Sequence, residues 1–371
     1  NSSKAMAMAI TITSKHVFPI IYLLLINVWT HAQPLLELPT IDLSEPNEIV
    51  ADKIHEACKT WGFFYLTNHG VSEKTIEDTY AQLLTFFNLP YEEKMKTHSR
   101  NVEGHRGYLG LSETGFYGKD DSDHRPEEIN GSKSLDNHEM FIMGSEVSHE
   151  YEYYTPTYFA PNIFPKHDVQ FEKVLQKYFD TMKILSNELW GYFALSLKLK
   201  QDFFREHASI PLLTMNCNYY PASDEANSTT LGITDHTDFE VFTILSQQSE
   251  RNGLEIWING SWHLVTPLPG SFVINLGNMM PRLTSNLYRS TIHRAKNIYD
   301  AERLSVAFFV GPNYDFMLEP LLSSDVVKEH VEHQIQENSL QAYEKLIAGE
   351  FSAALIENSV CLEEDQCQEV N

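Results

Sequence analysis

The sequence predicts a mixed α/β fold in which short strands form a sandwich or barrel and helices flank that core. Two successive hydrophobic patterns carry this prediction. Apolar residues recur at helical spacing along residues 168–200, as Phe171, Val174 and Tyr178 illustrate. After Leu212 the pattern becomes a series of short β-rich runs separated by Gly, Pro and Asn, which is typical of a sandwich or a barrel.

The same patterns define the elements in chain order. Before residue 168 they indicate short strands, two helices and a long polar, Gly-rich loop of the kind that often forms a functional lid. These elements are strands at 38–43 and 61–66, helices at 47–60 and 72–97 with a break or kink at Pro90, and a loop at 100–137. The core strands are expected at 213–220, 239–246, 254–258, 262–265, 271–276, 290–294 and 303–310, and a helical region at 324–358 follows them.

Composition and charge exclude several classes of protein. The chain has 371 residues, of which 42% are hydrophobic and 21% charged, so it is neither a disordered chain nor a fibrous repeat. Its formal net charge of −24 argues against nucleic acid as a partner, because that binding requires Lys and Arg to neutralise phosphates. The four cysteines show no C-x-x-C spacing; reduced thiols are expected, with a Cys361–Cys367 bridge as the alternative.

The N-terminal segment separates from the rest by composition. It has two lysines, no acid and the apolar run Val17–Trp29, as a signal peptide does, and that run is too short for a stable membrane span. An unstructured extension is the alternative, so localisation stays open between the cytoplasm and a secretory or organellar compartment. The expected plan is this segment at 1–33, a single domain at 34–360 (with parts 34–150, 151–323 and 324–360) and an acidic tail at 361–371.

Three residues form a candidate metal site. His236-Thr237-Asp238 begins an expected strand, where residues i and i+2 point to the same face. His293, in another expected strand, is available as a third ligand. Two His and one carboxylate on one face of a metal leave three positions open, as in non-haem Fe(II) oxygenases. A second such motif, His330-Val331-Glu332, falls in an expected helix, where i and i+2 diverge, and is interpreted as solvated surface.

Arg303 and Ser305 share one face of the last expected strand, ten residues beyond His293. A buried arginine is costly unless it meets an anion. Its guanidinium forms a bidentate fork with a carboxylate, and Ser305 can add one hydrogen bond. Two interpretations stay open: a carboxylate-bearing cosubstrate held beside the metal, or a buried ion pair with an acid of the chain.

Together these residues belong to an ordered set of motifs across residues 38–316. The set resembles the 2-oxoglutarate/Fe(II)-dependent dioxygenases of the isopenicillin N synthase-like group. Its members are Leu38-Pro39-Thr40-Ile41-Asp42-Leu43, Trp61-Gly62-Phe63-Phe64, Asn68-His69-Gly70-Val71, Asn218-Tyr219-Tyr220-Pro221, His236-Thr237-Asp238, Asn252-Gly253-Leu254-Glu255-Ile256, Trp262 to Gly277, Tyr288-Arg289-Ser290-Thr291-Ile292-His293-Arg294 and Arg303-Leu304-Ser305.

The resemblance implies a double-stranded β-helix (jelly-roll) core with flanking helices. The implied enzyme uses Fe(II), 2-oxoglutarate, O2 and, as an accessory, ascorbate to hydroxylate, desaturate or cyclise a small molecule of specialised metabolism, with release of succinate and CO2. The implied iron ligands are His236, Asp238 and His293, with no catalytic side chain beyond them. The implied 2-oxoglutarate contacts are Arg303, Ser305, Tyr220 and Asn218.

The substrate and the reaction outcome stay open. Arg106, Tyr108 and Phe309 are candidate substrate contacts, with packing roles as the alternative. The basic residues near Arg106 hint at an acidic or amino-acid-like substrate, and a monomer is expected. Asn278 stands where many relatives have Asp, which changes hydrogen bonding but removes no ligand. The rival functions are an Fe(II) oxidase that does not use 2-oxoglutarate and a non-catalytic ligand-binding relative.

Overall fold

The computed structural model describes residues 37–113, 136–222, 231–249, 251–297, 301–341 and 343–357. The segment at 1–33, the tail at 361–371 and the Cys361–Cys367 alternative lie outside these residues. The chain divides into two units at Glu37 and Leu38, and the second unit is the one described below. No described helix combines the length and apolarity that a membrane-spanning segment needs.

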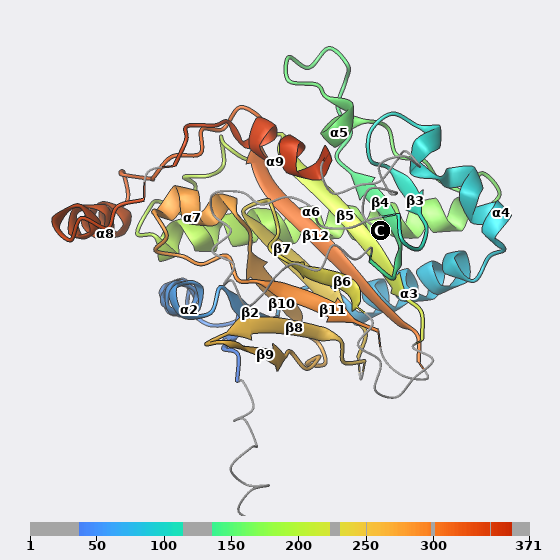
Figure 1. The fold of residues 1–371 in the computed structure, drawn as a ribbon, viewed down its shortest axis with the longest axis horizontal. Helices are drawn as coiled ribbons and strands as arrows, with labels where there is room; N and C mark the ends of the chain where they lie inside the picture. Colours follow the sequence, from blue (N-terminus) through green and yellow to red (C-terminus); the bar gives the residue numbers. More distant parts are fainter. Residues whose placement is uncertain are drawn as a thin grey trace, which may run out of the picture. The chain divides into compact units, whose positions relative to one another are not determined.

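The second unit alternates helices and strands before an almost uninterrupted series of strands (Figure 1). In chain order the described elements are β1 (Thr40–Asp42), α2 (Asn47–Thr60), β2 (Phe63–Thr67), α3 (Glu73–Phe87), α4 (Tyr91–Lys94), the 3-10 turns η1 (Met95–Thr97) and η2 (Ser99–Asn101), β3 (Gly107–Leu109), β4 (Glu139–Gly144), α5 (Pro156–Phe159), α6 (Val169–Ser196), β5 (Pro211–Tyr220), β6 (Leu231–His236), β7 (Phe242–Gln247), β8 (Leu254–Ile258), β9 (Ser261–Leu264), β10 (Phe272–Leu276), α7 (Met279–Thr284), β11 (His293–Lys296), β12 (Arg303–Asn313), α8 (Asp325–Gln336) and α9 (Ala348–Glu357).

Two sheets form the core. The larger has the strand order β1-β2-β10-β7-β12-β5-β4-β3, and the smaller has the order β6-β11-β8-β9. Every pairing is antiparallel except that of β1 with β2. The predicted mixed α/β class with a jelly-roll core and flanking helices is therefore confirmed.

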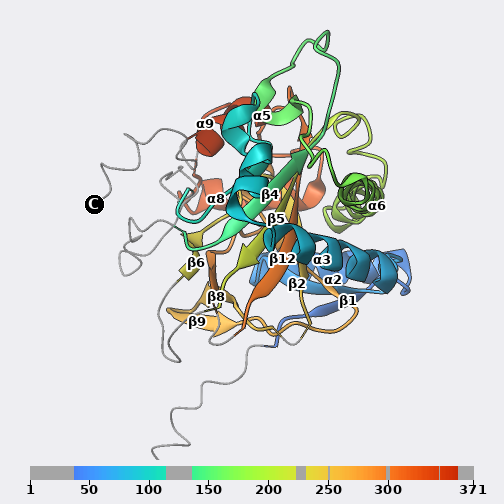
Figure 2. The same ribbon diagram turned by 90° about the vertical axis from the view of Figure 1, so that its right-hand side faces the viewer.

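Helices α2, α3 and α6 lie on one side of the large sheet, and the small sheet lies on the other side (Figure 2). Aromatic rings join α6 to the sheet: Phe179 lies 5.1 Å from Phe308 of β12, and Trp190 lies 5.2 Å from Phe242 of β7, between ring centroids. Because alternate residues of a strand face opposite sides, Phe308 faces α6, whereas Ser305 and Phe309 face the space between the sheets.

Local capping explains where the helices begin. The Asp168 side chain accepts hydrogen bonds from two backbone N–H groups at the start of α6, and Ser72 and Ser324 each accept one at α3 and α8. The break expected at Pro90 is confirmed, since α3 ends at Phe87 and α4 begins directly after that proline.

The strand prediction is wrong around the metal motif. His236 is the last residue of β6, which the sequence pattern did not reveal, and Asp238 lies in the loop before β7. The two residues therefore do not share one strand face. Gly232, Thr234 and Asp235 interrupt the apolar pattern of β6, which explains the error.

Two further expected segments differ from the structure. The helical region at 324–358 is two helices, because α8 ends before Asn338, whose φ of +54° is incompatible with a continuing helix. The polar loop at 100–137 contains strand β3, and residues 114–135 lie outside the described part. Strand β4 follows directly and was not expected; it extends the large sheet beside β5.

Gly62→Ala should destabilise the protein more than Gly70→Ala. Both glycines have positive φ, +64° and +75°, so both substitutions carry backbone strain of about 1–2 kcal/mol. A Cβ at Gly62 would also overlap the Arg289 carbonyl and lie 2.8 Å from Thr291 Oγ1, whereas a Cβ at Gly70 meets nothing within 4 Å.

We expect an additional loss of about 1–3 kcal/mol in the free energy of unfolding for Gly62→Ala, measured by urea denaturation. Equal losses for the two variants would show that the close approach of Gly62 to Arg289 does not constrain the fold.

Candidate metal centre and its cavity

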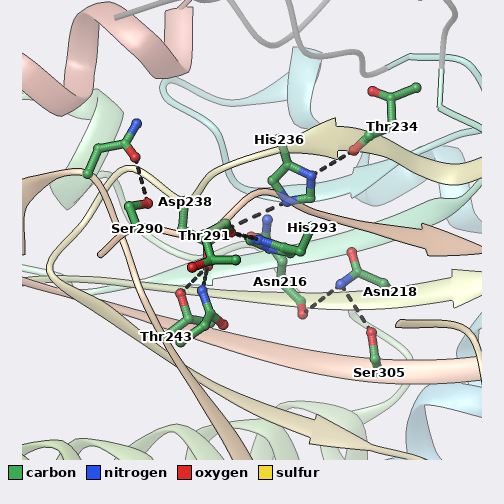
Figure 3. Close-up of polar contacts among 12 residues, drawn as sticks. Asn216, Asn218, Thr234, His236, Asp238, Thr243, Ser290, Thr291, His293 and Ser305 are labelled. Atoms are coloured by element: carbon green, nitrogen blue, oxygen red, sulfur yellow. Dashed lines mark hydrogen bonds and ion pairs between the residues drawn. The ribbon is translucent and has the colours of Figure 1, made fainter. Parts of the chain in front are cut away.

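The three predicted ligands meet where the small sheet ends beside the large one. His236 ends β6 and His293 begins β11, and the two residues are paired across these antiparallel strands. Their rings lie 4.2 Å apart between centroids. Asp238 reaches the same point from the loop after β6, and the three side chains converge in Figure 3.

The geometry suits one metal ion. Asp238 Oδ1 lies 3.6 Å from His236 Nε2 and 3.4 Å from His293 Nε2, and all ligand atoms lie within 4.8 Å of one another. Ligands about 2.1 Å from an octahedral ion lie roughly 3 Å apart, so small side-chain movements complete the site. Among the described residues this is the one group of its kind.

Backbone carbonyls orient both imidazoles. His236 Nδ1 lies 2.7 Å from the Thr234 carbonyl, and His293 Nδ1 lies 3.0 Å from the Thr291 carbonyl. A carbonyl oxygen only accepts, so each Nδ1 carries the proton and each neutral ring presents the Nε2 lone pair to the centre. That is the tautomer a metal ligand requires.

Asp238 is held in the same way. Its Oδ2 accepts hydrogen bonds from Thr243 Oγ1 and from Asn275 Nδ2, the latter at 2.6 Å, which leaves Oδ1 for the metal. Burial alone would raise the pKa of this carboxyl group, but the two imidazoles and the Thr243 hydroxyl outweigh burial and hold the pKa well below its usual range. Asp238 is therefore ionised and can act as a metal ligand.

Thr243 and Asn275 escaped the sequence analysis, although a signal existed. Both are single polar residues inside apolar strand runs, Phe-Thr-Ile-Leu in β7 and Phe-Val-Ile-Asn-Leu in β10. A buried polar residue in such a run needs a partner, and here the partner is the carboxylate of Asp238.

Asn278 joins the two segments that carry the ligands. Its backbone N–H donates to the Asp238 carbonyl at 2.8 Å, and its side-chain oxygen accepts from Ser290 Oγ at 2.8 Å. Ser290 lies three residues before His293. Asn278 thus supports the ligand positions from outside the metal centre.

Arg303 is buried beside the metal centre, with 2% of its surface exposed. Its Nε and Nη2 have no hydrogen-bond partner, and no described carboxylate lies within 4 Å. Its guanidinium carbon lies 3.8 Å from the centroid of the Tyr220 ring. The buried ion pair considered from the sequence is therefore absent among the described residues, and the unpaired guanidinium fits an anionic ligand.

Ser305, Tyr220 and Asn218 surround this guanidinium. Arg303 is paired with Tyr220 and Ser305 with Asn218 across β12 and β5. Ser305 Oγ lies 3.3 Å from the Tyr220 hydroxyl. The same Ser305 Oγ accepts a hydrogen bond from Asn218 Nδ2 at 3.5 Å, which Figure 3 shows. All four predicted residues thus come together, with hydroxyl and amide groups beside a free cation.

One cavity of about 210 Å³ contains both groups of residues. Of the candidate substrate contacts, Arg106 and Phe309 line it. Tyr108 does not; its hydroxyl donates to Glu139 at 2.6 Å, outside the cavity. Apolar side chains form much of the remaining wall; they are Met140, Ile142, Ile233, Phe239, Leu245, Leu254 and Ile356.

Glu240 is a further cavity residue that the sequence analysis missed. It is an acid in a loop, which no periodicity or spacing marks as functional. Burial, and secondarily the nearby Asp238 carboxylate, raise its pKa to about 7.

Comparison with known proteins agrees with this geometry. Residues 38–167 match the family described as non-haem dioxygenase in morphine synthesis N-terminal, and residues 211–312 match the 2OG-Fe(II) oxygenase superfamily. Codeine O-demethylase of Papaver somniferum is 30% identical over 339 residues, which covers 84% of this chain and 85% of the relative. Homoarginine-6-hydroxylase 2-ODD-C23.1 of Arabidopsis thaliana is 28% identical over 337 residues, covering 88% and 95%.

Solved structures share the fold. A Neurospora crassa protein in complex with alpha-KG and thymine has a TM-score of 0.70 at 24% identity, covering 88% of this chain and 98% of that one. JOX2 in complex with 2OG, Fe and JA has a TM-score of 0.68 at 24% identity, covering 91% and 89%.

Thr243→Val should weaken metal binding about 10- to 100-fold, because it removes a hydrogen bond that fixes Asp238 while keeping the side-chain shape. Anaerobic titration with Fe(II) or Mn(II) measures the affinity. Thr79→Val is the matched control: it removes an equally buried hydroxyl, bonded to the Thr75 carbonyl in α3, and should leave metal affinity unchanged. Equal affinities for the two variants would contradict the role of Thr243.

Metal affinity should fall as the pH falls from about 8 to about 5.5. Burial alone would lower the pKa of His293, but Asp238 and the Thr291 carbonyl outweigh burial and raise it. Because the pKa of His293 is raised, a proton competes with the metal for Nε2 at pH values above the ordinary pKa of histidine. The same anaerobic titration across this pH range measures the effect, and a constant affinity would contradict the assignment of His293.

Proposed function

The chain belongs to the 2-oxoglutarate- and Fe(II)-dependent oxygenase superfamily, and we propose that the cavity described above is the active site of such an enzyme. The protein is an oxidoreductase that acts on a small molecule. We assign the iron to His236, Asp238 and His293. When bound, iron and 2-oxoglutarate supply the activation of O2 that oxidises the substrate, with release of succinate and CO2.

The unpaired guanidinium of Arg303 is the observation that carries the proposal for 2-oxoglutarate. A buried cation without a carboxylate partner is unfavourable unless a ligand supplies the anion. Arg303 lines the same cavity as the metal ligands, so one dianion can contact both. An Fe(II) oxidase that does not use 2-oxoglutarate can retain such an arginine, so succinate release with turnover separates these two functions. A non-catalytic relative would have no use for the ordered ligand triad.

Each residue around the proposed 2-oxoglutarate site has a separate role. Arg303 binds the distal carboxylate, and Ser305 and Tyr220 donate hydroxyl hydrogen bonds to it. The Tyr220 ring also packs on the guanidinium, which fixes the plane of the fork. Asn218 holds Ser305 in place.

The wall of the cavity restricts the substrate. Its apolar side chains exclude water from the metal centre and pack against carbon atoms of the substrate. Arg106 adds a buried positive charge, so we propose an acidic or amino-acid-like substrate of specialised metabolism. The names of two relatives, the homoarginine-6-hydroxylases of Arabidopsis thaliana, support an amino acid. We also propose that the enzyme acts as a monomer.

Arg303→Ala should raise the concentration of 2-oxoglutarate needed for half-maximal binding by about 10- to 150-fold, since it removes a charge-assisted interaction of roughly 1.5–3 kcal/mol. Arg303→Lys keeps the charge and should cause a smaller increase. Calorimetry in the presence of Mn(II) measures binding, and succinate release with Fe(II) and O2 measures turnover.

His236→Ala provides the negative control, because loss of a metal ligand should abolish succinate release. Unchanged 2-oxoglutarate binding in both Arg303 variants would place the anchor elsewhere. Oxidation of a substrate without succinate release would favour the rival oxidase.

A further inference from the structure

Glu240 is an acid buried in the cavity wall without a cationic partner. It is 5% exposed and lies in the loop between Asp238 and β7. Ser352 Oγ of α9 donates to its Oε1 at 3.1 Å. No described Lys, Arg or His lies within 4 Å of the carboxylate. A carboxylate removed from water in this way requires a compensating cation or proton.

Arg106 is the complementary case in the same cavity. It is fully buried, and its terminal nitrogens donate to the backbone carbonyls of His105, Thr157 and Tyr158. Its Nε has no partner, and no described carboxylate lies within 4 Å. Neutral carbonyls therefore fix the orientation of the guanidinium but leave its charge uncompensated.

Both residues line the same cavity, and two glycines of the large sheet support them. The Arg106 guanidinium packs directly on Gly144, the last residue of β4. A Cβ at this position would overlap the guanidinium, so the close approach requires glycine. A Cβ at Gly311 of β12 would lie 3.5 Å from Glu240 Cγ. Gly144 is in register with Phe309 across β5, so the two supports lie two strand spacings apart across the sheet and two residues apart along it, roughly 12 Å.

Strand register places both supports away from Arg303 along β12. Gly144 is paired through Thr214 with Phe309, and Phe309 is paired with Thr243, which bonds the candidate ligand Asp238. Arg106 is thus supported at the level of the metal ligands, and Glu240 two residues beyond it at Gly311. A molecule bound between them can lie beside the metal without displacing 2-oxoglutarate at Arg303.

We propose that Arg106 and Glu240 bind the carboxylate and the ammonium group of a zwitterionic, amino-acid-type substrate, whose remaining carbon chain extends toward the metal. This inference rests on the proposed function and specifies its substrate class. A zwitterion compensates both buried charges at once. A simple carboxylic acid would leave Glu240 without a cation, and a neutral molecule would in addition leave Arg106 without an anion, so each is expected to bind less tightly than a zwitterion.

The first test varies the probe and leaves the protein unchanged. Wild-type protein with Mn(II) and 2-oxoglutarate is titrated calorimetrically with free L-α-amino acids of differing side chains. Each is compared with its Nα-acetyl form, which lacks the cation, and its carboxamide, which lacks the anion. We expect at least one free amino acid to bind, with each modification weakening that binding by about tenfold or more, since each leaves one buried charge unpaired.

The second test varies the protein. Glu240→Gln keeps the size of the side chain and removes its charge, so the preference for the free amine over the Nα-acetyl form should disappear while the preference over the carboxamide remains. Ser352→Ala is the matched control: it removes the hydroxyl that contacts Glu240 but keeps the charge, so both preferences should persist. Thermal melting checks that both variants fold.

Two results would overturn the inference. One is a wild-type protein that binds no free amino acid more tightly than its acetylated form; the other is a Glu240→Gln variant that keeps the amine preference. The proposed function has a separate readout, the binding of 2-oxoglutarate to the wild-type protein. If that binding is intact and the amine preference is missing, only the substrate inference fails; if 2-oxoglutarate does not bind, the site assignment itself fails.

Discussion

The cross-strand pairing of His236 with His293 is the constraint on which the rest of the site depends. Residues opposite each other in an antiparallel ladder have Cβ atoms about 5 Å apart, so the pairing of β6 with β11 delivers two imidazoles to one point without any special side-chain conformation. Asp238 joins them because the chain leaves β6 immediately after His236. Backbone carbonyls then select the nitrogen that faces inward. The hydrogen-bonded backbone thus positions both imidazoles, and the side chains of Thr243 and Asn275 complete the site by holding Asp238.

The large sheet provides a second, separate constraint, because one face packs against α6 and the other face lines the cavity. The outer face of β12 packs aromatic rings against α6, as Phe308 does against Phe179. That packing stabilises the strand by hydrophobic burial, and the inner face can therefore carry groups that do not contribute to stability. Arg303 and Ser305 occupy this inner face. The packing of α6 on the outer face of the sheet thus offsets the cost of the unpaired Arg303 guanidinium on the inner face.

The sequence was most informative where chemistry depends on short spacing. It predicted the bounds of α2, the break at Pro90, and the shared face of Arg303 and Ser305, since each follows from local periodicity. The metal motif was found although the expected strand was wrong, because a tight loop after a strand end brings i and i+2 together as well as a strand does. Glu240 could not be found, since its significance lies in the absence of a partner, which only the packing of distant segments determines.

The charges of the cavity also follow a common rule. Arg303, Arg106 and Glu240 each lie buried without an oppositely charged partner among the described residues, and each faces the same cavity. Direct pairing of Arg106 with Glu240 would have compensated both charges and stabilised the free protein. Because the two groups are held apart, neither stabilises the other in the empty cavity. A ligand of matching charge can then gain this electrostatic stabilisation as binding free energy. In the proposed substrate site, a ligand that lacks one of the two charges would leave Arg106 or Glu240 without a partner, so the same separation would also discriminate between substrates.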